Sequence, residues 1–116
     1  MEKDQVIIEV INKNASYPYD YDFYIGRGSP LGNPYTGSKV LSRTKAMYQV
    51  GSREEAIECY EKYLRERILL KDVKICETLN RIWRTLQIYG KVRLICFCKP
   101  LPCHGDIIKK IIEEKL

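Results

Sequence analysis

Short runs of apolar, β-branched residues predict strands at both ends of the chain. The segment Gln5–Asn12 (QVIIEVIN) is short and rich in such residues, which favours a strand over a helix. Lys91–Cys98 (KVRLICFC) is apolar over most of its length, as is typical of a buried strand. Phe23–Ile25 has the same character over fewer residues and predicts a second short strand. The chain therefore carries β-structure on both sides of its central region.

The central region begins with a helix-start signal followed by apolar residues at helical spacing. Ser52 and Glu55 have the spacing of a capping box, with Ser52 as the N-cap. The helix that follows is expected to end near Leu70. Its apolar residues fall on one stripe: Ile57, Tyr60, Leu64 and Ile68.

Two further helices are predicted by the same signals. Asp72 can cap a second helix, and Gly90 stands where the glycine that ends a helix belongs. The segment Asp106–Leu116 is expected to form the last helix. Apolar residues recur at helical spacing in both: Ile75, Leu79, Ile82 and Leu86 in the second helix, and Ile107, Ile108, Ile111 and Ile112 in the last.

The resulting order is strand, strand, loop, helix, helix, strand, loop, helix, which predicts an α/β fold. We expect a small mixed or parallel sheet with helices packed on it. The 116 residues suit a single domain over residues 1–116. Gly26–Gly37 is expected to be an ordered turn or irregular loop, whereas the pattern of Lys39–Val50 is ambiguous.

Composition and charge narrow the class of protein. Hydrophobic residues make up 45% and charged residues 30% of the chain, as in globular proteins. No apolar run approaches the ~18–20 residues of a membrane helix, and the first residues lack the apolar core of a secretory signal. We therefore expect a cytoplasmic protein with no membrane partner. The net charge of +5 favours polyanions such as nucleic acid or a phosphorylated ligand, and it equally suits a solubilising surface.

The first candidate site is the segment Gly26–Pro34, in which glycines alternate with stiffening prolines. Gly26, Gly28 and Gly32 allow close approach of backbone N–H groups to a ligand. The segment lacks the G-K-[ST] ending of a P-loop and the G-x-G-x-x-G spacing of a dinucleotide fingerprint. The alternative is a tight turn between strands. The ligand-binding side chains would be Arg27, which suits phosphate or carboxylate, and Ser29 and Asn33, which could orient a ligand.

The second candidate site is the segment Cys96–Asp106, which admits three interpretations. In the first, a zinc ion is bound by Cys96, Cys98, Cys103 and His104. Their C-x-C-x4-C-H spacing differs from the paired C-x-x-C pattern of common zinc knuckles. The five cysteines of the chain, an odd number without a secretory signal, argue against a disulfide framework.

In the second interpretation, this segment is a catalytic or anion-binding loop between a strand and a helix. Open α/β sheets bind ligands at such positions, and helix N-termini attract anions and lower thiol pKa values. Cys103 would be a nucleophile or His104 a general acid–base, while Asp106 would orient His104 or cap the helix. In the third interpretation, the cysteines and the histidine are structural.

Tyrosines gather just before the glycine-rich segment. Tyr17, Tyr19, Tyr21 and Tyr24 surround Asp20 and Asp22. We expect these rings to cover a sheet edge or to close over the glycine-rich segment. Stacking on nucleobases is the alternative, against which the adjacent aspartates argue because they repel phosphates.

Three segments together carry a resemblance to a known family. YIGRGSPLGNPY, SREEAIECYEKYL and LICFCKPLPCHGD, in that order, resemble the small microbial and phage family called domain of unknown function 4326. The resemblance extends from about Val6 to Ile112. This sequence departs from the family pattern in two places, a longer Tyr/Asp insert before Tyr24 and the Thr36–Val50 connection. It implies a whole-chain domain with its site in the two loops, and it brings no established reaction.

These observations lead to a functional hypothesis and a rival. The first is a protein that binds a nucleotide- or nucleoside-type ligand and acts on a phosphorylated or glycosidic small molecule. The rival is a zinc-stabilised module that binds nucleic acid or protein. The first hypothesis requires Arg27 and Cys103, far apart in the sequence, to line one pocket.

Overall fold

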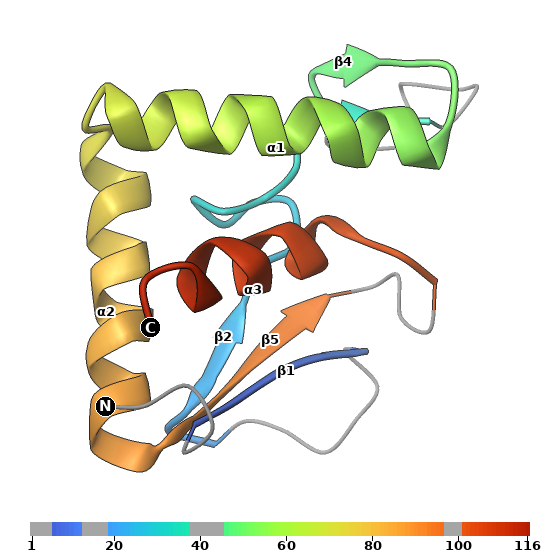
Figure 1. Ribbon diagram of the computed structural model, residues 1–116. Helices are drawn as coiled ribbons and strands as arrows, with labels where there is room; N and C mark the ends of the chain where they lie inside the picture. The colour runs from blue at the N-terminus through green and yellow to red at the C-terminus, as the bar shows by residue number, and fades with distance from the viewer. Residues whose placement is uncertain (1–5, 13–18, 38–45, 97–100) are drawn as a thin grey trace.

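The computed structural model describes residues 6–12, 19–37, 46–96 and 101–116. It contains a small parallel sheet, a separate pair of very short strands and three helices, which confirms the predicted α/β fold (Figure 1). Along the chain the elements are β1 (Ile7–Asn12), β2 (Asp22–Tyr24), β3 (Tyr35–Thr36), β4 (Tyr48–Gln49), α1 (Arg53–Leu69), α2 (Val73–Tyr89), β5 (Lys91–Cys96) and α3 (His104–Glu113).

The main sheet has the order β1-β5-β2, and both pairings are parallel. The central strand β5 is the most deeply buried, because it has a neighbour on each edge and helices packed against it. Its side chains Val92, Leu94, Ile95 and Cys96 are fully buried. Since all three strands run the same way, β5 and β2 deliver the chain to the two candidate loops at one edge of the sheet.

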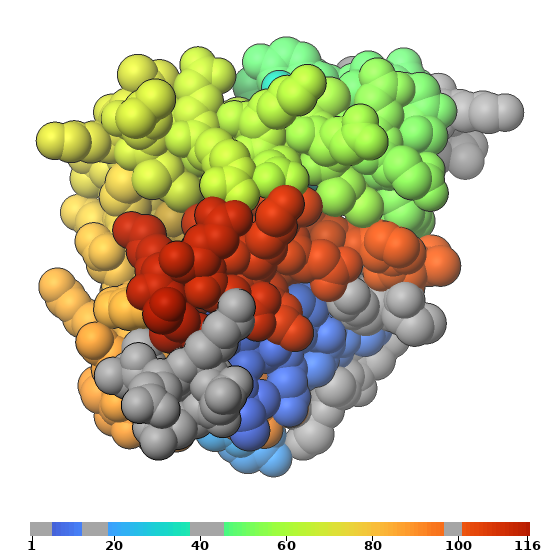
Figure 2. Space-filling view, in the orientation of Figure 1, coloured from blue at the N-terminus to red at the C-terminus, as the bar shows by residue number. Residues whose placement is uncertain are grey.

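The helices enclose a single core with this sheet. Both α2 and α3 contact β5, and α1 lies across α3. Figure 2 shows α3 exposed along one side and set between α1 and β1. The buried cluster draws on both candidate loops as well as on helices and sheet, through Leu31 of the first loop and Cys103 of the second. Among the described helices, none is long and apolar enough for a membrane crossing.

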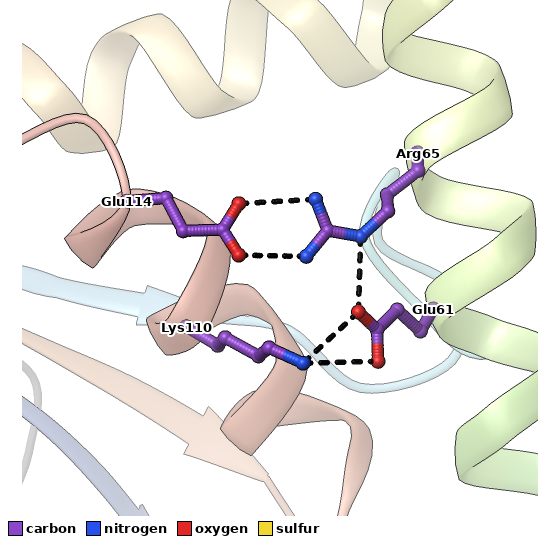
Figure 3. Close-up of polar contacts among 4 residues, drawn as sticks. All are labelled: Glu61, Arg65, Lys110 and Glu114. Atoms are coloured by element: carbon purple, nitrogen blue, oxygen red, sulfur yellow. Dashed lines mark hydrogen bonds and ion pairs between the residues drawn. The ribbon is translucent and has the colours of Figure 1, made fainter.

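An ion-pair network holds α1 against α3 (Figure 3). Arg65 donates two hydrogen bonds to Glu114, at 3.0 and 2.8 Å, and a third to Glu61 at 2.9 Å. The ammonium of Lys110 lies 3.1 Å from the Glu61 carboxylate. Exposed pairs contribute little individually, but these connect the later turns of both helices. The N-termini of α1 and α3 consequently lie on the same side of the molecule, as Figure 1 shows.

The predicted helix caps are present, with one difference. Ser52 accepts a hydrogen bond from the backbone N–H of Glu55, Asp72 accepts one from Ile75, and Gly90 ends α2 in the left-handed conformation. The Glu55 carboxylate, however, accepts from the N–H of Gly51 at 2.9 Å, one residue before the position that a capping box requires.

The structure differs from the sequence prediction at the start of the last helix and in two additional short strands. The last helix begins at His104 rather than Asp106, because Cys103 is the N-cap and Asp106 occupies the third helical position. The segments predicted as loop and ambiguous connection contain β3 and β4, whose two residues each are too few to show a periodic pattern. β5 ends at Cys96, and the predicted strand residues 97 and 98 lie outside the described residues.

Candidate functional site

The two predicted loops meet in one cavity of about 380 Å³. It opens beyond the carboxyl ends of β5 and β2, between the N-termini of α1 and α3. The prediction that Arg27 and Cys103 line one pocket is confirmed. The lining residues are Gly26, Arg27, Asn33, Tyr35, Thr36, Gly37, Arg53, Ala56, Ile57, Pro102, Cys103 and His104.

Arg27 stabilises the glycine-rich loop and contributes a positive charge to the cavity wall. Its Nε donates to the carbonyl of Asn33 at 2.9 Å, and one terminal nitrogen donates to the carbonyl of Tyr35 at 2.8 Å. These bonds hold the side chain in place across the loop. A positive charge fixed in this way loses little conformational freedom when an anion binds.

Asn33 and Ser29 both have structural partners. The buried amide of Asn33 donates to the carbonyl of Ala56 in α1 at 3.2 Å and accepts from the N–H of Tyr35 at 2.9 Å. This side chain therefore ties the loop to α1 while lining the cavity. Ser29 donates to the carbonyl of Gly26 at 2.7 Å. Both side chains thus stabilise the loop, and their contact with a ligand stays a prediction.

The glycines of this loop have different positions relative to the cavity. Gly26 lines it, whereas Gly32 donates its N–H to the carbonyl of Ser29 and closes a turn beside it. Gly28 has a φ of +100°, which residues other than glycine rarely adopt. Gly28 and Ser29 line a neighbouring groove instead. Of the predicted ligand-binding residues, Gly26, Arg27 and Asn33 are therefore together in the cavity.

The start of α3 forms the opposite wall. Cys103 is the N-cap, and its backbone N–H donates to the Asp106 carboxylate at 3.2 Å. Asp106 thus caps the helix, one of its two predicted roles, and lines a separate hollow beside β1. The buried thiol of Cys103 lies 3.4 Å from that of Cys96. Cys103 and His104 line the cavity, and a catalytic role for them or for Asp106 stays a prediction.

His104 is held rigidly between the sheet and α1. Its Nε2 lies 2.5 Å from the carbonyl oxygen of Ile25, and its ring packs edge-on against Tyr60 with the centroids 5.0 Å apart. A carbonyl can only accept, so Nε2 carries the proton and the neutral ring has its lone pair on Nδ1. Burial lowers the pKa of His104; the bond to Ile25 opposes this and the charge of Arg27 adds to it.

We predict that His104 titrates below its ordinary pKa of 6.5 in the folded protein. It is the sole histidine of the sequence, so its ring protons can be followed by NMR without assignment. The folded state prefers the neutral ring, so unfolding is favoured as the pH falls from 6.5 towards the folded-state pKa. The same protein in urea, titrating near 6.5, is the control. A folded midpoint at or above that of the urea sample would contradict the burial described here.

Sequence reasoning missed Arg53, the second arginine of the cavity. It is the first residue of α1, where a positive side chain opposes the helix dipole. That unfavourable position is a local signal that could have marked Arg53 as a candidate site residue. Tyr35 was also missed; burial raises the pKa of its hydroxyl, with smaller contributions from Cys59 and from neighbouring tyrosines. Nothing in its local pattern indicates a site.

The zinc interpretation is only partly covered by the structure. Within residues 6–12, 19–37, 46–96 and 101–116, no group of three or more potential ligands gathers around one point. Cys96 and Cys103 are close, but Nε2 of His104 faces a carbonyl. Cys98, the remaining predicted ligand, lies outside the described residues. Zinc binding therefore stays an alternative.

Comparison with known proteins places the chain among uncharacterised relatives. The family model described as "Domain of unknown function (DUF4326)" matches residues 8–114. The chain is 36% identical over 108 residues to an uncharacterized 12.4 kDa protein in the nrdA-td intergenic region of Enterobacteria phage T4, covering 93% of this chain and 80% of that protein. No solved structure matches significantly. On the family match and this relative, the chain belongs to the family described as domain of unknown function 4326.

Proposed function

We propose that this protein binds a nucleotide- or nucleoside-type ligand in the cavity between the two loops, with an anionic group of the ligand held near Arg27 and Arg53. The observation that carries the proposal is the shared cavity itself. It brings both arginines to the N-termini of two helices at the carboxyl edge of a parallel sheet. Ligands of open α/β proteins bind at this edge.

The charge distribution favours an anion. The first turns of α1 and α3 leave backbone N–H groups without partners in the helix and carry the positive ends of the helix dipoles. Arg27 and Arg53 add full charges to the same cavity, and none of the described residues that line it is acidic. A phosphate would therefore meet positive potential from several directions.

The remainder of the cavity suits the less polar part of a nucleotide. Its volume of about 380 Å³ falls in the range of small-molecule sites. Ala56 and Ile57 supply apolar surface. The ring of Tyr35 packs against Tyr48 and Tyr63, with centroids 5.2 and 6.3 Å away, in a separate hollow that these three tyrosines line together.

Two lining residues would supply the chemistry if the ligand is also transformed. His104 is kept neutral at pH 7 by the lowering of its pKa, which leaves a ring nitrogen able to accept a proton. Cys103 lines the same wall, and its thiol is buried beside that of Cys96. Attack on a phosphorylated or glycosidic centre needs a proton acceptor or a nucleophile in this position, and the proposal assigns these roles to His104 and Cys103.

Replacing Arg53 tests the proposal with little risk to the fold, because this side chain is exposed at the start of α1. Arg53→Ala is expected to weaken binding of a mononucleotide about tenfold or more, as expected for losing a charge-assisted hydrogen bond. Titration calorimetry across nucleoside mono- and triphosphates, nucleosides and inorganic phosphate measures this loss.

Arg67→Ala is the matched control for that experiment. It removes the same charge from the same helix, near the end remote from the cavity. We expect it to leave nucleotide affinity within about twofold, since distant exposed charges are screened. The proposal is wrong if the unaltered protein binds no member of the panel, or if both variants bind as it does.

A further inference from the structure

A second hollow lies directly beside the cavity and shares Arg27 with it. This groove, about 870 Å³ in volume, runs between the glycine-rich loop and α2. One side is formed by Gly28–Pro30, and the other carries Arg81 and Arg84. A ligand lying along the groove would therefore reach the cavity at Arg27.

We propose that the groove binds the backbone of a single-stranded nucleic acid, so that the nucleotide in the cavity belongs to a strand. This inference rests on the proposed function, because the cavity must accept a nucleotide. It extends the proposed function by naming the ligand as a polymer. The phosphates next to the nucleotide in the cavity would lie along α2.

The α2 side of the groove has the chemistry that phosphates require. Arg81 and Arg84 are three residues apart on the helix, so both side chains project towards the same face. Both are exposed while lining the groove, and each presents a planar set of N–H donors. Together with Arg27 they place three guanidinium groups along one path.

The opposite side permits close approach of a backbone. Gly28 and Pro30 are exposed, and nothing lies within 4 Å of the position that a Cβ of Gly28 would occupy. Open space over a glycine in a rigid turn lets a sugar–phosphate chain contact the protein backbone. The groove is therefore accessible along the loop as well as along the helix.

Among the described residues, two acidic ones also line this groove, and both have partners in the protein. The Asp22 carboxylate accepts two hydrogen bonds from Arg93, at 2.6 and 2.8 Å, which balances its charge. Asp20 accepts a hydrogen bond from the hydroxyl of Tyr89, a neutral donor, at 3.3 Å. Phosphates would consequently lie beside Arg81 and Arg84, and not at the end of α2 where Asp20 bonds to Tyr89.

A single strand suits this arrangement better than a duplex. The cavity has room for about one nucleotide by volume, and its base would have to leave any stack to enter. In a single strand that base is unpaired from the start. Sites of this kind combine a positive groove with aromatic side chains, and Phe23 and Tyr24 line this groove.

The test compares a polymer with a monomer on the same variants. Fluorescence anisotropy is measured with a labelled single-stranded DNA of about ten nucleotides, its RNA equivalent and the corresponding duplex. We expect the unaltered protein to bind a single strand more tightly than a mononucleotide, with the duplex weaker. Arg81→Ala/Arg84→Ala is expected to weaken single-strand binding about tenfold at moderate salt and to reduce the salt slope by about 1.4. Mononucleotide affinity should stay unchanged.

Lys62→Ala/Arg67→Ala is the control, because it removes two exposed positive charges from α1 outside this groove. Equal losses in both double variants would overturn the inference in favour of general charge attraction. Mononucleotide binding without any preference for a single strand would overturn the inference and leave the proposed function standing. If neither mononucleotide nor strand binds, both are wrong. A preference between the DNA and RNA strands identifies which of the two is bound.

Discussion

Replacing Asp22 by alanine is expected to lower the free energy of unfolding by about 3–5 kcal/mol, the usual cost of removing one partner of a buried ion pair. The Asp22 side chain is 1% exposed and that of Arg93 12%. The carboxylate accepts from two nitrogens of Arg93 and, at 2.8 Å, from the backbone N–H of Tyr19. The variant removes the Asp22 carboxylate from a largely buried guanidinium.

The effect should extend beyond the pair because of where it lies. Asp22 and Arg93 face each other in the register of β2 and β5. The guanidinium of Arg93 lies 4.8 Å from the ring centroid of Tyr19, which stacks on Tyr21. Since β2 leads into the glycine-rich loop, loosening this strand should also weaken ligand binding in the cavity.

The neighbouring strand pair offers a matched control. Lys91 and Glu9 form an ion pair at 3.6 Å between β5 and β1, with side chains 33% and 42% exposed. Glu9→Ala is expected to cost no more than about 1 kcal/mol, as for exposed pairs. Urea denaturation of both variants decides the matter. Equal losses would show that burial of Asp22 does not matter. Recovery of stability in Asp22→Ala/Arg93→Met would show that the cost comes from the buried charge of Arg93.

The same pair predicts how stability depends on pH. Burial alone raises the pKa of Asp22, but hydrogen bonds from Arg93 and Tyr19 and the charges of Arg93 and Lys91 outweigh it, so the pKa is lowered from 3.8. The ionised Asp22 therefore makes its full contribution to the free energy of unfolding at pH values above its ordinary pKa of 3.8. This contribution is lost as the pH falls below 3.8 through the folded-state pKa. In Asp22→Ala this part of the acid dependence should be missing.

The parts of the fold that were predictable are those with local signals. The helices α1 and α2 each have a side-chain N-cap and an apolar stripe, and β1 and β5 are dense in apolar residues. These features depend on neighbours within a few positions, so the sequence displays them. The meeting of the two loops was also predictable, because the carboxyl ends of parallel strands lie at one edge.

The remainder depends on partners distant in the chain. The β3–β4 pair is held by carbonyls of Pro34 and Thr36, which accept from N–H groups more than ten residues later. No local pattern shows that Asn33 bonds to Ala56 in α1. The side chain of Arg27 likewise donates to the carbonyls of Asn33 and Tyr35, and no pattern in the sequence around Arg27 indicates these partners. The residue types of the site were therefore visible in the sequence, while the division between structural and ligand-binding roles was not.

Gly37→Ala is expected to destabilise the protein by about 3 kcal/mol, at the upper end of ordinary overpacking costs. A Cβ at this position would lie 2.5 Å from the carbonyl carbon of Ser52 and 2.7 Å from the nitrogen of Arg53. Both are backbone atoms at the start of α1. On its other side the chain is held through the carbonyl of Thr36, which accepts from the N–H of Val50 at 2.8 Å. The added methyl group therefore has no flexible neighbour to displace.

Gly51→Ala separates this clash from a general effect of replacing glycine. Near Gly51, the atom that a Cβ would approach is a carboxylate oxygen of Glu55, at 2.8 Å, and this flexible side chain can move. We expect that variant to change stability by less than about 1 kcal/mol. Urea denaturation gives the stabilities, and calorimetry with a mononucleotide gives the affinities. The Gly37 clash falls on the backbone of Arg53, which lines the cavity. We therefore expect only Gly37→Ala to weaken mononucleotide binding as well, measured at urea concentrations where both variants are folded. Equal stability of the two variants would mean that the loop does not press on α1, and that the cavity wall at Arg53 is not set by this contact.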